Sequence, residues 1–325
     1  MPRRVSCTGV CLADPGPDEA MTATVPVKDI ILPFQVDRAA LRGRFVRLGP
    51  VLSHILDRHN YPVPVAMLLA ELVVLTAALG SALKYDGIFT LQTSGKGPVS
   101  ILVADMTSAG ELRGYAQFDA ERVAALDEGP QLSPVPALIG AGHLAFTVDQ
   151  GADTERYQGI VALEGSTLAD CIQHYFRQSE QIDAAIKLAL DRDDVAGWSG
   201  GALMIQRLPG ARDEQHVTRA ESDEAWREAV TLMSTARSNE ITDPALAPEQ
   251  LLYRLFHEPG VRAFEAQPVS ASCRCSRERV ARTLGAFPRD EILSLMENGK
   301  VDVRCEFCGE SYSFDQAALD GLFAG

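Results

Sequence analysis

The sequence is short of positive charge. Its 30 lysines and arginines face 44 aspartates and glutamates, which gives a formal net charge of −14. A chain of this charge repels polyanions, so we expect neither nucleic acid nor an anionic membrane as a partner. The most cysteine-rich segment is not a basic patch either, because acidic residues nearly equal basic ones between Cys273 and Cys308.

The amino-terminal segment lacks the apolar stretch of a secretory signal. MPRRVSCTGVCLADPGP contains two arginines but no apolar core of about 7 to 15 residues. We therefore expect a cytoplasmic protein. In a reducing compartment, paired cysteines are read as metal ligands or redox thiols before structural disulfides.

Histidine is scarce, with six residues, and no acidic partner is placed beside one, which weakens the hypothesis of a serine hydrolase. GWSGG matches the G-x-S-x-G motif, but the surrounding sequence predicts a helix before Ser199 and a strand after it, the reverse of a nucleophile elbow. GKG at 95–97 lacks the rest of a phosphate loop and is expected to be a hairpin turn. One predicted helix contains three residues that could form a catalytic cluster: His174, Tyr175 and Glu180. We expect these side chains to pack in the core or to lie at the surface instead. We assign no catalytic residue and expect no enzyme.

A long apolar run, Val63 to Leu83, could span a bilayer by its length. Glu71 stands in its middle, and Pro62 and Pro64 suit the start of a soluble helix. We therefore expect a buried core helix. With 46% hydrophobic residues over 325 positions, the chain can form one large domain and a smaller one.

The pattern of the large domain predicts an α+β fold. Helices are expected at about 48–59 and 64–83, followed by five short alternating runs that read as an antiparallel meander. The next helix is expected to begin at a Ser166/Thr167 cap and to continue to Leu190, after which GGALMIQRL returns to strand. This domain is expected to cover 27–212, after an untidy, disordered extension over 1–26.

The region from Asp213 to Arg262 is predicted to be a helical linker. Trp226, Val230 and Met233 recur at helical spacing and form one apolar stripe. A second stripe contains Leu251, Leu252, Leu255 and Phe256. Amphipathic helices of this kind need a surface to pack against. An ordinary packed connector between two domains has the same periodicity, so this alternative stays open.

Four of the seven cysteines form two tight pairs, Cys273/Cys275 and Cys305/Cys308. Four thiolates from two such pairs can close one tetrahedral zinc site, so we expect a small four-cysteine zinc domain over 263–325. The insert between the pairs is expected to contain a helix that Pro288 opens and Gly299, after Asn298, closes. Arginines near the ligands can offset the negative charge of the sulfurs; they are Arg274, Arg277, Arg279, Arg282 and Arg304.

The cysteine spacing leaves two roles open. A purely structural zinc module is the usual meaning of a four-cysteine pattern. In the Cys-x-Cys pair, however, the chain holds two sulfurs close together, and a small strained disulfide would be readily reduced again. Local tethering predicts Cys273–Cys275 and Cys305–Cys308 disulfides on oxidation. Cys7 and Cys11 in the extension, and Cys171 as a buried thiol, are expected to be dispensable.

CRCSRERV together with VRCEFCGESYSF resembles the carboxy-terminal signature of the heat shock protein 33 family, the redox-regulated holdase chaperones. The resemblance extends upstream through GPVSILVADMTSAGELRGYAQF, YFRQSEQI and GGALMIQRLPG, from about Asp29 onward. It implies that Cys273, Cys275, Cys305 and Cys308 are zinc ligands and redox sensors. It further implies that oxidation releases zinc, unfolds the module and linker, exposes a client-binding surface on the large domain and favours a homodimer.

Two other functions remain as alternatives. A thiol-disulfide oxidoreductase could use CEFC, but that motif normally opens a helix in a thioredoxin-like unit, which this context does not resemble. A zinc-ribbon interaction module would bind one specific partner, and its binding would not depend on oxidation.

Overall fold

The computed structural model describes most of the chain. The described residues are 10–11, 29–38, 40–126, 134–151, 154, 156–180, 182–195, 197–207 and 218–323. Within them the strands form sheets of seven, six and two strands. Apart from the short strand β1 (Val10–Cys11), the predicted extension 1–26 lies outside the described residues, Cys7 included.

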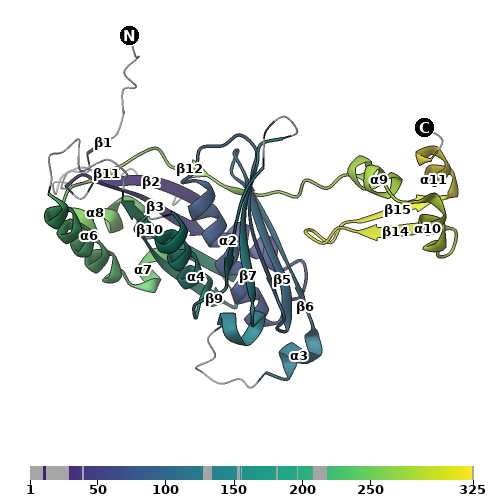
Figure 1. Cartoon of the computed structure of the whole chain (residues 1–325), viewed down its shortest axis with the longest axis horizontal. Helices are drawn as coiled ribbons and strands as arrows, with labels where there is room; N and C mark the ends of the chain where they lie inside the picture. The colour runs from purple at the N-terminus through teal and green to yellow at the C-terminus, as the bar shows by residue number, and fades with distance from the viewer. Residues whose placement is uncertain are drawn as a thin grey trace, which may run out of the picture.

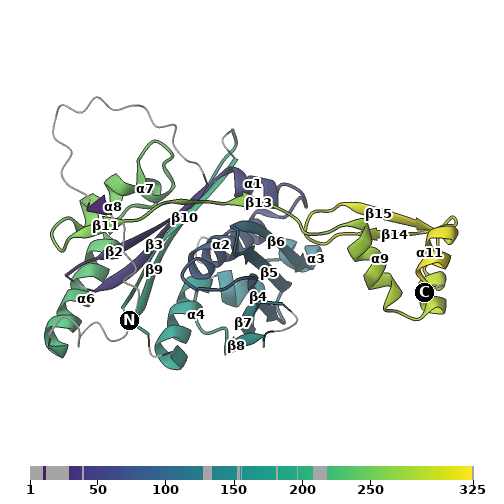
Figure 2. The same ribbon diagram turned by 90° about the horizontal axis from the view of Figure 1, so that it is seen from above.

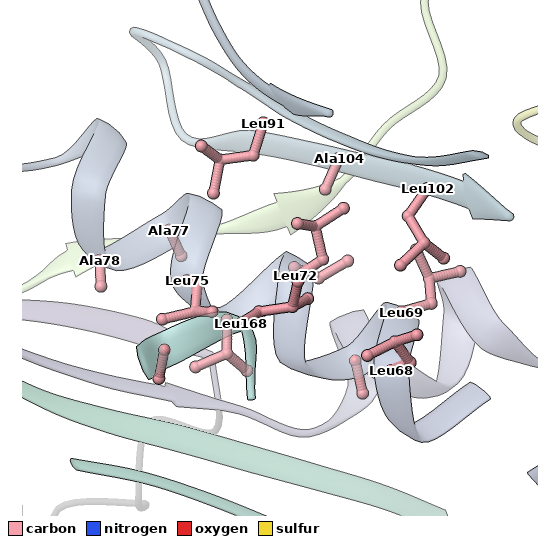
Figure 3. Packing of buried hydrophobic residues seen from close by; sticks show 14 of the residues in the cluster. Leu68, Leu69, Leu72, Leu75, Ala77, Ala78, Leu91, Leu102, Ala104 and Leu168 are labelled. Carbon is pink, nitrogen blue, oxygen red and sulfur yellow. The ribbon is translucent and has the colours of Figure 1, made fainter. Parts of the chain in front are cut away.

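Helix α2 (Val63–Gly80) lies between the two large sheets (Figures 1 and 2). Its residues are apolar on every side, and such a helix is stable only when it is surrounded. Figure 3 shows its leucines facing Leu91 and Leu102 of the six-stranded sheet, with Leu168 of a neighbouring helix beside them. By length and composition α2 could cross a membrane, but 83% of it is buried inside the protein. The predicted core helix is confirmed, and the shorter α1 (Pro50–Leu56) precedes it.

The six-stranded sheet has the order β13-β6-β5-β4-β7-β8. Its members are β13 (Ser270–Ala271), β6 (Glu111–Phe118), β5 (Val99–Thr107), β4 (Ile88–Gly95), β7 (Gly142–Asp149) and β8 (Tyr157–Ala162). The five strands from β4 to β8 pair with one another antiparallel, as predicted, whereas β13 pairs with β6 in parallel.

The predicted meander is wrong in one respect, because β7 pairs with β4 and not with β6. The connection from β6 to β7 contains α3 (Ala120–Ala124) and the π-helical turn η1 (Val135–Ile139). This connection is long enough to carry the chain past β5 and β4, so that β7 pairs with the far edge of β4. Alternating hydrophobicity marks strands but does not say which edges pair. The predicted hairpin turn at 95–97 is confirmed, since it joins the antiparallel pair β4 and β5.

The seven-stranded sheet has the order β1-β11-β2-β3-β10-β9, with β12 also paired to β2. Its remaining members are β2 (Ile30–Val36), β3 (Leu41–Leu48), β9 (Ala184–Asp193), β10 (Gly197–Arg207), β11 (Val261–Ala263) and β12 (Gln267–Pro268). The strand predicted from GGALMIQRL is confirmed as part of β10. Sequence reasoning assigned no structure to β2 and β3. The mixture of sheets and helices confirms the α+β class.

Helix α4 (Leu168–Tyr175) begins at the predicted Thr167 cap. The Thr167 hydroxyl accepts from the Asp170 N–H, and the Asp170 carboxylate accepts from the Thr167 N–H. The predicted continuation of the helix to Leu190 is wrong, because a π-helical turn η2 (Phe176–Glu180) ends it and β9 follows. A short apolar run fits helix or strand equally, and pairing along β10 decides the matter here.

The linker forms α6 (Arg219–Ser234), α7 (Ser238–Thr242) and α8 (Pro248–Phe256), which pack on the seven-stranded sheet. Both predicted stripes face that sheet, and the Phe34 and Phe256 rings stack at 5.9 Å. Buried Arg47 of β3 holds the same region, since its Nε and Nη1 donate to the carbonyls of Ile241 and Leu246, both at 2.8 Å. The expected amphipathic helices therefore have the surface that they need.

The carboxy-terminal module projects away from the two large sheets (Figures 1 and 2). It contains α9 (Arg277–Gly285), α10 (Arg289–Ser294), β14 (Lys300–Arg304), β15 (Ser311–Asp315) and α11 (Gln316–Leu322). Pro288 is the N-cap of α10 as predicted, but the helix ends at Ser294, before the expected stop. Asn298 and Gly299, with φ of 51° and 78°, instead form a two-residue turn between Glu297 and Lys300.

Candidate metal centre

The four paired cysteines converge at the end of the module that faces the large domain. Cys273 and Cys275 lie between β13 and α9, and Cys305 and Cys308 lie in the turn between β14 and β15. The four Sγ atoms all lie within 4.8 Å of one another, and all four residues are half-buried. The Cys273 and Cys305 sulfurs are 3.7 Å apart, and those of Cys275 and Cys308 are 3.3 Å apart.

The backbone of the Cys305–Cys308 turn is closed by two hydrogen bonds. The Gly309 N–H donates to the Cys305 carbonyl and the Cys305 N–H to the Glu310 carbonyl, both at 2.8 Å. Gly309 has a φ of 72°, which glycine adopts without strain. Burial raises the pKa of the Cys305 and Cys308 thiols, whereas the N–H groups of Phe307 and Cys308 at Cys305, and of Glu310 at Cys308, act to lower it. The turn is thereby shaped to present two sulfurs as acceptors.

These residues fit a tetrahedral thiolate metal site. Four sulfurs at about 2.3 Å from one ion stand about 3.8 Å from each other, whereas a disulfide needs about 2.05 Å. The observed sulfur separations of 3.7 and 3.3 Å are close to the first value and far from the second. The donor set therefore allows these four cysteines to bind one metal ion.

The thiols differ in how readily they ionise. Burial opposes ionisation of Cys273, but hydrogen bonds from the Cys275 N–H and the neighbouring thiols lower its pKa to about 7. Burial raises the pKa of Cys308, and its sulfur neighbours raise it further because negative charge gathers around it. A cluster that crowds several thiolates in this way favours a bound cation.

Most of the five predicted arginines do not contact the sulfurs directly. Arg274 Nη2 donates to Asp105 at 2.6 Å, Arg279 Nη1 to the Arg274 carbonyl and Arg304 Nε to the Gly309 carbonyl. Arg277 lies over the Phe314 ring, with 4.4 Å to its centroid. Their contacts support the backbone around the site and its junction with the large domain.

Two groups at the sulfurs were missed by sequence reasoning. Arg113 of β6 lies close enough to the Cys273 sulfur to interact with it electrostatically, and the Tyr312 hydroxyl donates to the Cys275 sulfur at 3.1 Å. Tyr312 follows Cys308 closely in a strand, so a strand register could have suggested it. Arg113 lies in a distant part of the chain, and no local pattern marks it.

The other candidates do not assemble a site. Ser199 lies within β10, opposite Asp191 of β9, so a strand precedes it where a helix was predicted, and no elbow forms. His174 contacts Glu164 at 3.2 Å, while Tyr175 is buried and stacks on Phe146. The side chain of Glu180 lies outside the described residues. Cys171 is buried as predicted, and burial raises its pKa to about 11, which makes it a poor nucleophile.

The combined geometry defines a class of protein: a large α+β domain with a helical linker on one sheet and a four-cysteine module held against the other. Comparisons with known proteins agree with this class. The profile of the family described as Hsp33 protein matches residues 29–315. The chain therefore belongs to the Hsp33 family.

Curated relatives are similar over nearly their whole length. The 33 kDa chaperonin of Caulobacter vibrioides is 40% identical over 291 residues, covering 88% of this chain and 95% of its own. Those of Ectopseudomonas mendocina and Shewanella loihica are 38% and 37% identical, covering 90% and 91% of this chain and 94% and 96% of theirs. Membership of this family supports a chaperone function, which implies the binding of client proteins.

A solved structure has the same fold. The 33 kDa chaperonin (heat shock protein 33 homolog) of Thermotoga maritima superposes with a TM-score of 0.74 at 22% identity. The match covers 91% of this chain and 98% of that one.

Proposed function

We propose that this protein is a redox-regulated holdase in the cytoplasm. In the reduced state Cys273, Cys275, Cys305 and Cys308 hold one zinc ion, and the chaperone is inactive. Oxidation converts the four thiols to two disulfides, releases zinc and allows the chain to bind unfolding proteins, as a homodimer and without catalysis. The observation that carries this proposal is the convergence of the four sulfurs at metal-site spacing, in a module linked to the helices that cover a large apolar face.

The module has little else to hold it together. Among its described residues, five apolar side chains are buried, and the apolar side chains around them are only partly buried; the five are Leu284, Ile292, Val301, Phe314 and Leu319. Bound zinc would supply on the order of 10 kcal/mol or more of folding free energy to such a module. A core of this size does not replace that contribution, so loss of the four thiolates should unfold the module.

The oxidation balances with a peroxide as oxidant. One thiolate attacks a peroxide oxygen, giving a sulfenic acid and one water after proton uptake. A second thiolate attacks that sulfur, and a second water leaves, so two electrons pass from two sulfurs to one peroxide molecule. Two disulfides therefore consume two peroxide molecules per chain.

Chain tethering supports local disulfides, Cys273–Cys275 and Cys305–Cys308. The reduced geometry brings sulfurs of different pairs within 3.7 and 3.3 Å, so proximity alone does not select the local pairs. Once the module opens, however, only the partner separated by one or two intervening residues stays near the oxidised sulfur. Cys7, Cys11 and Cys171 are not needed in this scheme.

The linker connects the module to the client-binding surface. Helices α6 and α8 cover buried side chains of the seven-stranded sheet, among them Phe34, Phe45 and Leu203. If unfolding of the module loosens these helices, the sheet exposes a contiguous apolar face of the kind that binds unfolded proteins.

The proposal is tested on one sample, before and after peroxide treatment, by zinc content, peptide mapping and light scattering of an aggregating client. We expect one zinc per reduced chain, local disulfides after oxidation, and suppression of scattering only in the oxidised sample. Predominant links between the two pairs, or well under one zinc in reduced protein, would contradict it. Rapid insulin reduction with a dithiol donor would favour an oxidoreductase, and partner binding unaffected by oxidation would favour a zinc-ribbon module.

A further inference from the structure

The large domain contacts the metal centre through the Cys305–Cys308 turn. Phe307, between the two cysteines, is half-buried against β6. The Arg113 guanidinium lies 3.7 Å from the centroid of the Phe307 ring, and the Tyr115 ring meets the same ring edge-on at 4.8 Å. In Figures 1 and 2 the end of the β14–β15 hairpin points toward the six-stranded sheet.

The backbone of the turn is held as well as its side chain. His59 Nε2 lies 3.1 Å from the Phe307 carbonyl oxygen, and Arg58 Nη1 donates to the Cys308 carbonyl at 3.2 Å. Both residues follow α1, so they come from a different element than Arg113 and Tyr115. Arg58, His59, Arg113 and Tyr115 together form what we term the turn-docking face.

Arg113 is oriented by a buried carboxylate. Its Nε and Nη2 donate to Asp105 Oδ2, each at 3.0 Å, and the Asp105 side chain is 5% exposed. Arg274, between the cysteines of the other pair, donates to Asp105 Oδ1 at 2.6 Å. Asp105 thus joins one arginine of the large domain to one arginine of the module.

The charges across this contact are complementary. Four thiolates around a divalent cation carry a formal charge of −2, and Arg113 and Arg274 outweigh Asp105 beside them by one positive charge. A cationic donor of this kind stabilises a sulfur in its thiolate form.

We propose that the turn-docking face binds the metal-holding form of the Cys305–Cys308 turn, and that Arg113 acts as a positioning residue that slows metal loss. The inference rests on the proposed zinc site. The docked turn is the one closed by the hydrogen bonds from the Gly309 N–H to the Cys305 carbonyl and from the Cys305 N–H to the Glu310 carbonyl. A Cys305–Cys308 disulfide would bring the two sulfurs to about 2.05 Å and change that geometry. Docking and disulfide formation therefore oppose each other.

Thermodynamic linkage gives the proposal a measurable consequence. If the metal-holding turn docks more tightly than the metal-free turn, docking must raise metal affinity by the same factor. Couplings of this type are commonly about 5-fold to 150-fold. Weakening the docking face should therefore speed zinc release without removing any cysteine.

The test is the rate of zinc release from the reduced, full-length protein to an excess of a zinc-binding chromophore. We expect Arg113→Gln and Phe307→Ala each to speed release by about fivefold or more. The increase in the double variant should be smaller than the product of the two single increases, because the two changes share the Arg113–Phe307 contact. Tyr115→Ala, which leaves the module sequence intact, should act in the same direction.

Matched controls separate docking from general damage. Phe287→Ala removes an exposed aromatic side chain of the same module, and Arg156→Gln removes an exposed arginine of the large domain, so both should release zinc at the wild-type rate. Unchanged release from Arg113→Gln and Tyr115→Ala, each holding one zinc, would overturn the docking proposal alone. A wild-type chain that retains no zinc would overturn both this proposal and the proposed function.

Discussion

The two ends of this chain are held together by different forces. In the large domain, α2 is enclosed by two sheets and its leucines are fully buried, so apolar burial stabilises it. The carboxy-terminal module buries five apolar side chains and brings four sulfurs together. The large domain therefore has an apolar core of its own, whereas the module, under the proposed function, depends on the metal bound by its four cysteines.

The largest expected difference between the regions comes from removing the metal. Treating the reduced protein with a strong chelator should unfold the module, because zinc bound as proposed would supply about 10 kcal/mol of its folding free energy. The large domain should stay folded. Limited trypsin digestion measures this through its arginine sites: we expect rapid cleavage at Arg279 and Arg289 and protection of Arg42 and Arg47. Equal cleavage rates in the module and in the large domain would show that metal removal does not unfold the module selectively.

A cavity in the core of the large domain should destabilise that domain and leave the zinc content of the module unchanged. Leu72→Ala in α2 removes a fully buried side chain and should lower the free energy of unfolding of the large domain by about 2–5 kcal/mol. Zinc content should not change, because Leu72 belongs to the core between the sheets. Urea unfolding, with zinc measured on the same samples, checks both expectations. A variant that loses zinc in parallel with stability would show that the regions are not independent.

Glu71 offers a test by pH within α2. Burial raises its pKa to about 7, although its carboxylate accepts from the Ala169 N–H at 3.0 Å and thereby caps α4. Because the folded-state pKa lies above the unfolded value, the folded chain holds the extra proton. This contribution to stability is full below about pH 4.3 and is lost as the pH rises through about 7.

Glu71→Gln keeps an oxygen that can accept from Ala169 but cannot ionise. We expect the difference in unfolding free energy between variant and wild type to grow by up to about 3 kcal/mol from pH 5 to pH 8, in favour of the variant. Urea titrations at several pH values measure it. A pH-independent difference would mean that Glu71 does not titrate in this range.

The smallest expected effect concerns the linker. Arg47→Met leaves the Ile241 and Leu246 carbonyls without their donor, at a cost of about 1–3 kcal/mol. We expect faster hydrogen exchange in α7 and α8 of the reduced protein, with zinc retained. Arg42→Met is the matched control, since Arg42 lies on the same strand and donates to Gln206 of β10, away from the linker. If both variants speed hydrogen exchange in α7 and α8 equally, Arg47 has no specific role in holding the linker on the sheet.

Features that depend on neighbouring residues could be predicted from the sequence. The apolar run with prolines at its start indicated α2, the Thr167 cap fixed the start of α4, and the short cysteine spacings indicated a four-sulfur site. The amphipathic stripes of the linker were also visible, because their period reports one buried face. Each of these features is determined by residues that lie close together in the sequence.

Features that depend on distant partners could not be predicted. The run from Ala184 became β9 because β10 pairs with it, and β7 crossed to β4 through a long connection. The same limit applies to the site. Arg113 and Asp105 reach the cysteines only because β13 continues the six-stranded sheet beside β6, which brings Arg274 to Asp105. The predicted domain boundaries stay predictions, since β11, β12 and β13 link the module to both large sheets.

The central claim is that oxidation at the cysteines loosens the linker and uncovers the sheet beneath it. Hydrogen exchange of α6 and α8, followed by mass spectrometry while peroxide releases zinc, tests it most directly. The account predicts that amides of 219–234 and 248–256 lose protection in step with zinc release, while those of 63–80 do not. Client binding that appears while the linker amides keep their full protection would contradict it.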